Sequence, residues 1–238
     1  MNSDFQFHQI GVIHSPFSDK FGLPRQPGLV QGNLGKIELF SPWDRQEALQ
    51  GLEGFSHLWI VFVFHQAIKS TEDWRPTVRP PRDGAKRQGV FATRSPYRPN
   101  PIGLSKVRYL GWEKQQEKLF LNIEDGDMLN GTPVLDIKPY LPYADICAEA
   151  TGGFAQDAPQ ASALPIIYSE LAAEQLTQAE NRYPQFKILL ESTLKHNPRP
   201  VHFGHIQQRE QFGLRLYDYN IQWQLQPDHI FVVAFNND

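Results

Sequence analysis

The chain has 238 residues, of which 40% are hydrophobic and 21% are charged, and its formal net charge is −3. This composition is ordinary for a soluble globular protein and excludes a largely disordered chain. A single cysteine, Cys147, excludes an intramolecular disulfide and a cysteine-rich zinc site, and it fits a reducing, cytoplasmic compartment.

The beginning of the chain, MNSDFQFHQIGVIHS, lacks the basic stretch and apolar run of a secretory signal. The longest apolar segment, 58–64, is far shorter than the roughly 20 residues that a membrane-spanning helix needs. We therefore expect a cytoplasmic protein without a membrane span.

Up to about residue 150, short runs of β-branched and aromatic residues alternate with glycine and proline. Such runs predict short strands, and seven of them at this spacing favour a sandwich or a barrel. The expected strands are 9–14, 36–40, 57–65, 89–93, 104–112, 118–124 and 133–140. One helix is expected among them, capped by Ser41, begun by Pro42 and ended by Gly51.

After residue 150 the pattern changes. A Thr-Gly-Gly linker leads into 165–182 and 185–196, where apolar residues recur at helical spacing, and Pro184 separates the two predicted helices. The strands 220–226 and 229–235 follow, joined by a Pro-Asp turn. The sequence therefore predicts a mainly β domain over 1–150 and a small α+β domain over 151–238.

Charge is unevenly distributed along the chain. Between Arg75 and Arg108 there are nine lysines and arginines and one acid, so this stretch carries +8 while the remainder carries −11. Such a basic patch is typical of a polyanionic or phosphate-bearing partner. The alternative is a solvated loop whose arginines pair with acids elsewhere. Prolines at 76, 80, 81, 96, 99 and 101 stiffen the stretch and favour the binding function.

Two predicted strands place reactive side chains together. In PVLDIKPY, alternation along the strand puts Val134, Asp136, Lys138 and Tyr140 on one face. The polar residues of this face are either a reactive group or a solvent-facing ion pair. Gly126 and Gly131, in the loop before this strand, permit close approach of the backbone to a ligand.

The pattern of HLWIVFVFHQ predicts a strand buried on both faces. Such a strand places His65 and Gln66 at a rim where a ligand could contact them. A histidine at the end of a strand can equally have a structural role.

Motifs for common nucleotide-binding folds, P-loops, zincins and α/β-hydrolases are missing from the sequence. His202 and His205 form an H-x-x-H pair, but no third ligand candidate lies nearby in the sequence. We therefore expect no metal site.

Five motifs follow one another along the chain: GVIHSPF, PRQPGLV at 24–30, LEGFSHLWIVFVFHQ at 52–66, RPPRDGAKRQGVFATRSPYRPNPIGLS at 79–105 and NGTPVLDIKPYLPYAD at 130–145. Together they resemble the TrmO family of S-adenosylmethionine (SAM) dependent tRNA methyltransferases, once grouped under the name TsaA. The stretch FGLRLYDYNIQWQL looks like part of the accessory domain of bacterial members.

The resemblance implies a single-sheet β-barrel that binds SAM, unrelated to the Rossmann-type methyltransferases, and a homodimer. It also implies methylation of N6 in N6-threonylcarbamoyladenosine, just 3′ of the anticodon in threonine tRNA. The implied SAM contacts are Pro24, Arg25, Gln26, His65, Gln66, Arg94, Leu104, Met128, Leu129, Asn130, Gly131 and Thr132. Asn130 replaces the aspartate common in relatives, and it can still accept a hydrogen bond.

A tRNA substrate implies phosphate contacts in the basic stretch. The expected contacts are Arg75, Arg79, Arg82, Lys86, Arg87 and Arg98, with strongly salt-dependent binding. Trp74 and Tyr97 could stack on splayed bases of the anticodon loop or belong to the core.

The N6 nitrogen is a poor nucleophile until it loses its proton, because it is conjugated to a purine ring and a carbonyl. We expect Asp136 to act as the base, with Lys138 holding its charge or a substrate carboxylate and Tyr140 orienting the base. Positioning alone could instead carry much of the rate. Two other functions remain open: a SAM- or RNA-binding module without catalysis, and a methyltransferase of the same fold with another substrate.

Overall fold

The computed structural model describes residues 5–67, 74–80, 86–198 and 211–237. Arg82, His202 and His205 lie outside the described residues. The described chain forms two compact units, each assembled from several segments. The first, here the β unit, comprises the described residues of Met1–His14, Lys36–Ile123 and Gly131–Ala158. The second, here the α+β unit, comprises those of Ser15–Gly35, Glu124–Asn130 and Pro159–Asp238.

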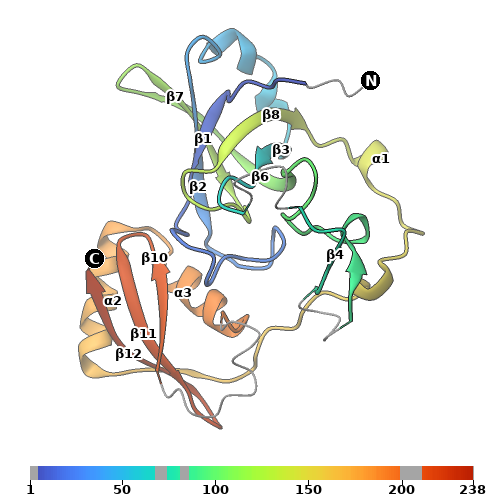
Figure 1. Cartoon of the computed structure of the whole chain (residues 1–238). Helices are drawn as coiled ribbons and strands as arrows, with labels where there is room; N and C mark the ends of the chain where they lie inside the picture. Colours follow the sequence, from blue (N-terminus) through green and yellow to red (C-terminus); the bar gives the residue numbers. More distant parts are fainter. Residues whose placement is uncertain (1–4, 68–73, 81–85, 199–210, 238) are drawn as a thin grey trace. The chain divides into compact units, whose positions relative to one another are not determined.

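Six strands form an antiparallel sheet that closes on itself in the order β1-β2-β7-β6-β3-β8, with β8 pairing back to β1 (Figure 1). Their bounds are β1 Gly11–His14, β2 Leu34–Leu39, β3 His57–Val63, β6 Ile102–Gln115, β7 Lys118–Glu124 and β8 Pro133–Pro139. The expectation of a mainly β region before residue 150 is confirmed.

The interior of this sheet is filled by the alternate apolar residues of its strands. On β3, Leu58, Ile60 and Phe62 are buried while the residues between them are only partly covered. The interpretation of β3 as buried on both faces is therefore wrong. Gly103 lies opposite Phe62, and a Cβ at this glycine would fall 2.2 Å from the Phe62 ring, so the packing requires glycine there.

Two expectations for the β unit fail. The predicted strand 89–93 is the 3₁₀ turn η4 (Val90–Ala92), preceded by a short ribbon of β4 (Thr77–Val78) and β5 (Gln88–Gly89). The predicted helix after Ser41 is two 3₁₀ turns, η1 (Gln46–Leu49) and η2 (Leu52–Gly54). Gly51 lies between these turns with a φ of 85°, outside the range of a continuing right-handed helix.

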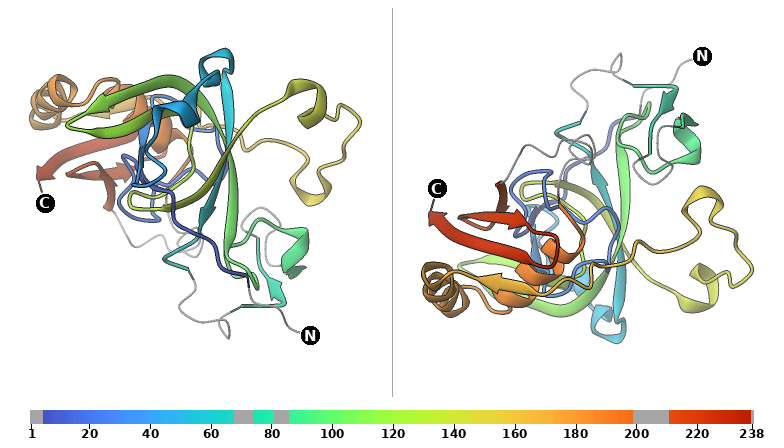
Figure 2. Two further views of the ribbon diagram at one scale, coloured as in Figure 1. Left: turned by 90° about the horizontal axis from the view of Figure 1, so that it is seen from above. Right: turned by 90° about the horizontal axis from the view of Figure 1, so that it is seen from below.

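Strands β6 and β7 form a long hairpin whose turn projects from the sheet (Figure 2). The turn residues Gln116 and Glu117 have φ values of 46° and 66°. Positive φ at both central residues is the geometry that suits the twist of a tight hairpin. The chain then continues beyond β8 through α1 (Pro142–Asp145) and the turn η5 (Gly153–Ala155).

The last third of the chain forms a four-stranded sheet in the order β10-β11-β12-β9, with helices α2 and α3 beside it (Figure 1). The elements are β9 Ile166–Tyr168, α2 Glu170–Arg182, α3 Phe186–Lys195, β10 Phe212–Leu216, β11 Tyr219–Leu225 and β12 Ile230–Asn237. The expected α+β character is confirmed. The predicted helix 165–182 begins only at Glu170, because 166–168 pair with β12 and the Ser169 hydroxyl accepts from the Ala172 amide as a helix cap.

The core of the α+β unit includes residues from the beginning of the chain. Phe17 and Val30 are buried together with Leu189, Leu214 and Trp223 in one cluster. Two helices and one sheet of the C-terminal region thus share their hydrophobic core with a segment more than 120 residues earlier.

Candidate functional site

The outward face of strands β8, β3 and β6 carries the predicted catalytic residues Asp136 and Lys138. In the strand register, Asp136 lies opposite Val61, and Lys138 lies opposite Trp59. A register shift near Leu135 turns Val134 inward, where it is completely buried opposite Phe62. The expectation that Val134 shares a face with Asp136 is therefore wrong, because the bulge adds one residue to the alternation.

Asp136 and Lys138 form an ion pair. The Lys138 Nζ lies 2.7 Å from Asp136 Oδ2, and the side chains of Lys138 and Asp136 are 63% and 48% exposed, respectively. The other carboxylate oxygen of Asp136 accepts from the Ile137 amide at 2.8 Å. The carboxylate is thus held in one orientation while remaining open to solvent, which suits either of the two predicted roles.

Tyr140 stands within an aromatic and cationic group that the sequence interpretation missed. Its ring centroid lies 5.7 Å from that of Trp59 and 6.1 Å from that of His57, and the Lys106 Nζ lies 5.4 Å from its ring. Trp59 donates through Nε1 to the Asp145 carboxylate at 3.0 Å. Outward alternation on β3 and β6 was the available signal for His57, Trp59 and Lys106.

The same outward face is partly apolar. Leu104, a predicted SAM contact, lies opposite Val61 on β6 and is 54% exposed. Ile102, two residues earlier, lies opposite Val63 and is also exposed. The face therefore offers apolar contact area beside the Asp136–Lys138 pair.

His65 and Gln66 follow the end of β3 and are exposed, as predicted for residues at the rim of a strand. The Phe64 amide donates to the Pro101 carbonyl at 2.8 Å, which fixes the exit of β3 beside the start of β6. Gly131 and Thr132 are tied to β1, because the Gly131 amide donates to the Ile13 carbonyl and the Ile13 amide to the Thr132 carbonyl.

The basic stretch is internally braced. Arg98 donates from Nη1 to the carbonyls of Thr93 and Ser95, both at 3.1 Å, and the Arg75 guanidinium lies 4.5 Å from the Tyr97 ring centroid. Tyr97 is thus half-buried under Arg75, which favours the core role over free stacking. Arg98 is used to organise its own loop.

Other cations of the stretch present exposed side chains. These are Arg79, Lys86, Arg87 and Arg94, with Arg75 also exposed beside Tyr97. Trp74 is 40% exposed. A rigid loop with outward cations is the arrangement expected for phosphate contacts.

The remaining predicted SAM contacts belong to the α+β unit. Pro24 and Met128 are buried, Gln26 and Leu129 are half-buried, and Arg25 and Asn130 are exposed. The Asn130 carboxamide oxygen accepts from the Ser15 amide at 3.2 Å, so Asn130 serves as a hydrogen-bond acceptor in the turn.

Arg25 has no carboxylate partner among the residues that the structure describes. Partial enclosure by protein lowers the pKa of its guanidinium, although part of the side chain reaches solvent. A partly enclosed cation with no carboxylate partner among the described residues is suited to bind an anionic ligand group.

A separate hollow of about 430 Å³ lies in the β unit and contains none of the predicted site residues. It is lined by Gln46, Glu47, Leu49, Gln50, Glu53 and Trp112. Within the described ranges, no group of three or more His, Cys, Asp or Glu side chains could hold a metal ion. No helix in the described part of the chain is long and apolar enough to cross a membrane.

Comparison with known proteins covers nearly the whole chain. The family model of the tRNA-methyltransferase O N-terminal domain matches residues 12–146, and that of the TrmO C-terminal domain matches residues 161–238. The tRNA (adenine(37)-N6)-methyltransferase of Escherichia coli K12 is 44% identical over 224 residues, which is 94% of each chain.

Two further matches come from Pseudomonas aeruginosa. The putative S-adenosylmethionine-dependent methyltransferase RcsF is 44% identical over 227 residues, again 94% of each chain. The crystal structure of TrmO from this organism superposes with a TM-score of 0.80 at 38% identity, and 99% of each chain is covered.

Proposed function

The chain belongs to the TrmO family and is a SAM-dependent tRNA (adenine-N6)-methyltransferase, and from this premise we propose that its substrate is N6-threonylcarbamoyladenosine next to the anticodon of threonine tRNA. The observation that carries the proposal is the Asp136–Lys138 pair beside Tyr140, on a face with exposed apolar and cationic neighbours. The methylated product would be the N6-methyl derivative of that nucleoside.

The residues predicted to hold SAM fit its chemistry. Arg25 offers a partly enclosed guanidinium without a carboxylate partner in the described chain, suited to the carboxylate of an amino-acid moiety. Pro24 and Met128 offer buried apolar surface. SAM, when bound, supplies an electrophilic methyl group on a sulfonium. The other contacts in our proposal are Gln26, His65, Gln66, Arg94, Leu104 and Leu129–Thr132.

Asp136 deprotonates the nucleophile, which is the N6 nitrogen of the substrate. Its carboxylate accepts the N6 proton as the nitrogen attacks the methyl carbon in line with the departing sulfur, so the nitrogen becomes methylated and the carboxyl protonated. Lys138, at 2.7 Å, stabilises the charged carboxylate before the transfer. Tyr140, whose ring packs against that of Trp59, limits the orientations open to the catalytic base.

Binding of the anticodon loop is assigned to the exposed cations of the basic stretch, Arg75, Arg79, Lys86 and Arg87. Arg98 serves chiefly to keep that loop rigid, through its bonds to Thr93 and Ser95.

Several broader features belong to the same proposal. A closed antiparallel sheet differs from the parallel sheet of Rossmann enzymes, which supports a non-Rossmann SAM-binding β-barrel. The family-model matches support a catalytic domain over 1–150 and an accessory domain over 151–238. Exposed Ile102 and Leu104 support a homodimer that covers this face, and a tRNA substrate supports a cytoplasmic location.

The substrate proposal is tested with threonine tRNA that carries or lacks the threonylcarbamoyl group. We expect methyl transfer from SAM only to the modified tRNA. Equal transfer to both forms would assign the protein to another adenine substrate, and SAM binding without any transfer would favour the non-catalytic alternative.

A further inference from the structure

We infer that the C-terminal helix α3 and the β10–β11 turn position the proposed SAM residues 24–26 and 128–130. The inference rests on the proposed function, because those residues are SAM contacts only under that proposal. It gives the accessory region a role in cofactor binding through the segments 15–35 and 124–130, which share its compact unit.

The apolar contacts bracket the proposed SAM residues in sequence. Phe17, before them, and Val30, after them, are completely or almost completely buried in the core formed with α2, α3 and β10–β12. Leu23 and Leu129, which directly adjoin Pro24 and Met128, pack against the same core. Removing that core would expose the apolar anchors on both sides of residues 24–26.

Polar contacts tie both ends of the segment 15–35 to the C-terminal region. The Gln31 amide donates to the Ser192 hydroxyl of α3 at 3.0 Å. At the other end, the Tyr217 amide donates to the Pro16 carbonyl at 2.7 Å, and the Ser18 hydroxyl donates to the Tyr217 carbonyl at 3.2 Å. These bonds cross more than 150 residues of sequence, so they depend on the folded C-terminal region.

The backbone at Gly32 approaches α3 too closely for any side chain. A Cβ built there lies 2.9 Å from the Leu189 amide nitrogen and 3.1 Å from the Gln185 carbonyl oxygen. Gly28, in the same segment, has a similar φ of 75° against 71°, yet its Cβ would meet nothing within 4 Å. Comparing substitutions at Gly32 and Gly28 therefore separates the effect of disturbed contact with α3 from the strain of a positive φ.

Segment 124–130 is hydrogen-bonded to segment 15–35. The Gly28 amide donates to the Asp125 carbonyl at 3.1 Å, and the Asn130 amide donates to the Phe17 carbonyl at 2.8 Å. The Asn33 side chain also donates to the Gly126 carbonyl. Displacement of segment 15–35 from α3 should therefore disturb residues 128–130 as well.

The expected change in SAM affinity follows from the fraction of molecules in which segment 15–35 is docked on α3. If only the docked arrangement binds SAM, a substitution that lowers its population to about a tenth raises the Kd for SAM about tenfold. The catalytic rate at saturating SAM and the affinity for tRNA should change much less, because neither depends on the free energy of docking once SAM is bound.

The experiment compares the full-length wild type, Gly32→Ala and Gly28→Ala by calorimetric titration with SAM and by initial rates. We expect Gly32→Ala to raise both the Kd and the KM for SAM about tenfold with a nearly unchanged kcat, and Gly28→Ala to stay within about threefold of wild type. Ser192→Ala should raise the Kd about threefold, and Ser192→Thr, which keeps the hydroxyl, should restore it.

Two further arms make the result decisive. Thermal unfolding shows whether the Gly32→Ala protein folds. If it does not fold, the comparison of Ser192→Ala with Ser192→Thr tests the positioning role. Arg25→Ala must weaken SAM binding, since otherwise the segment is not a cofactor site and the proposed contacts are wrong. If Arg25→Ala weakens binding but folded Gly32→Ala and Ser192→Ala bind SAM like wild type, the positioning role alone is overturned.

Discussion

Replacing Asp136 by asparagine separates a catalytic base from a structural ion pair, because the two roles predict very different magnitudes. As a pair, Asp136 and Lys138 are about half exposed, so their attraction contributes about 1 kcal/mol or less to stability. As a general base, Asp136 contributes a factor of about 10² to 10⁴ to the rate, which corresponds to about 3 to 5 kcal/mol in the activation free energy.

The assay is the single-turnover rate of methyl transfer at saturating SAM and tRNA, with thermal unfolding measured in parallel. We expect Asp136→Asn to lose at least about a hundredfold in rate with little change in unfolding temperature. Lys138→Gln, which leaves the carboxylate in place, should lose less, because it removes only the neighbouring charge.

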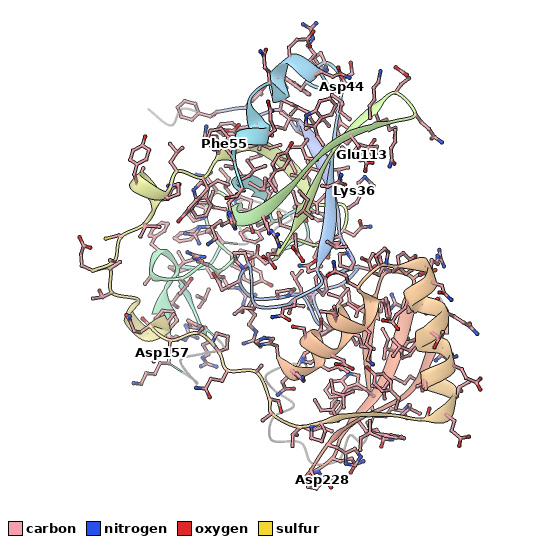
Figure 3. The ribbon with its side chains drawn as sticks, turned by 180° about the vertical axis from the view of Figure 1, so that it is seen from behind. Lys36, Asp44, Phe55, Glu113, Asp157 and Asp228 are labelled. Atoms are coloured by element: carbon pink, nitrogen blue, oxygen red, sulfur yellow. The ribbon has the colours of Figure 1, made fainter. Side chains whose placement is uncertain are left out.

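A matched control is available within the β unit. Lys36 and Glu113 form a pair of the same length, 2.7 Å, with side chains 40% and 36% exposed (Figure 3). Glu113→Gln removes a comparable carboxylate from outside the proposed site and should leave the rate unchanged. A rate for Asp136→Asn within about threefold of wild type would refute the base assignment and leave the ion pair as the function of Asp136.

Three other predictions concern packing, charge and tRNA binding. Gly103→Ala should destabilise the protein by about 1 to 3 kcal/mol in urea unfolding through overlap with the Phe62 ring, whereas Gly54→Ala, with open space around its Cβ, should not; equal effects would contradict the packing argument. Hydrogen bonding to Lys118, then to His14, lowers the pKa of Glu38, so it stabilises the fold above its unfolded pKa and that stability is lost as the pH falls through the folded value. Glu38→Gln should therefore flatten the loss of unfolding temperature on acidification, and an unaltered acid profile would refute the linkage. Arg79→Ala should lower the slope of log K for tRNA against log salt by about 0.7 to 0.9, and an unchanged slope would remove this phosphate contact.

The sequence predicted those parts of the fold that depend on local pattern. Alternation located the strands of the closed sheet, and apolar spacing located α2 and α3. The segment 89–93 was misread because Val90 and Phe91 favour strands locally, while the observed turn is fixed by contacts within the basic stretch, such as the Thr93 hydroxyl to Val90 carbonyl bond.

The candidate site was predictable only in part, because several of its features need tertiary information. Period-two alternation was enough to place Asp136 and Lys138 together, but not to find the bulge that turns Val134 inward. Nothing local to Phe17 or Val30 indicates that their core partners lie beyond residue 170. Nor does local pattern show that segments 15–35 and 124–130 share a compact unit with the C-terminal region.

Nucleoside analysis of bulk tRNA identifies directly the nucleoside that receives the methyl group. Purified protein would be incubated with isotope-labelled SAM and bulk tRNA from a strain without this activity, and the digested nucleosides separated by mass spectrometry. We predict that the label appears in N6-methyl-N6-threonylcarbamoyladenosine. Label confined to any other nucleoside would contradict the proposed substrate.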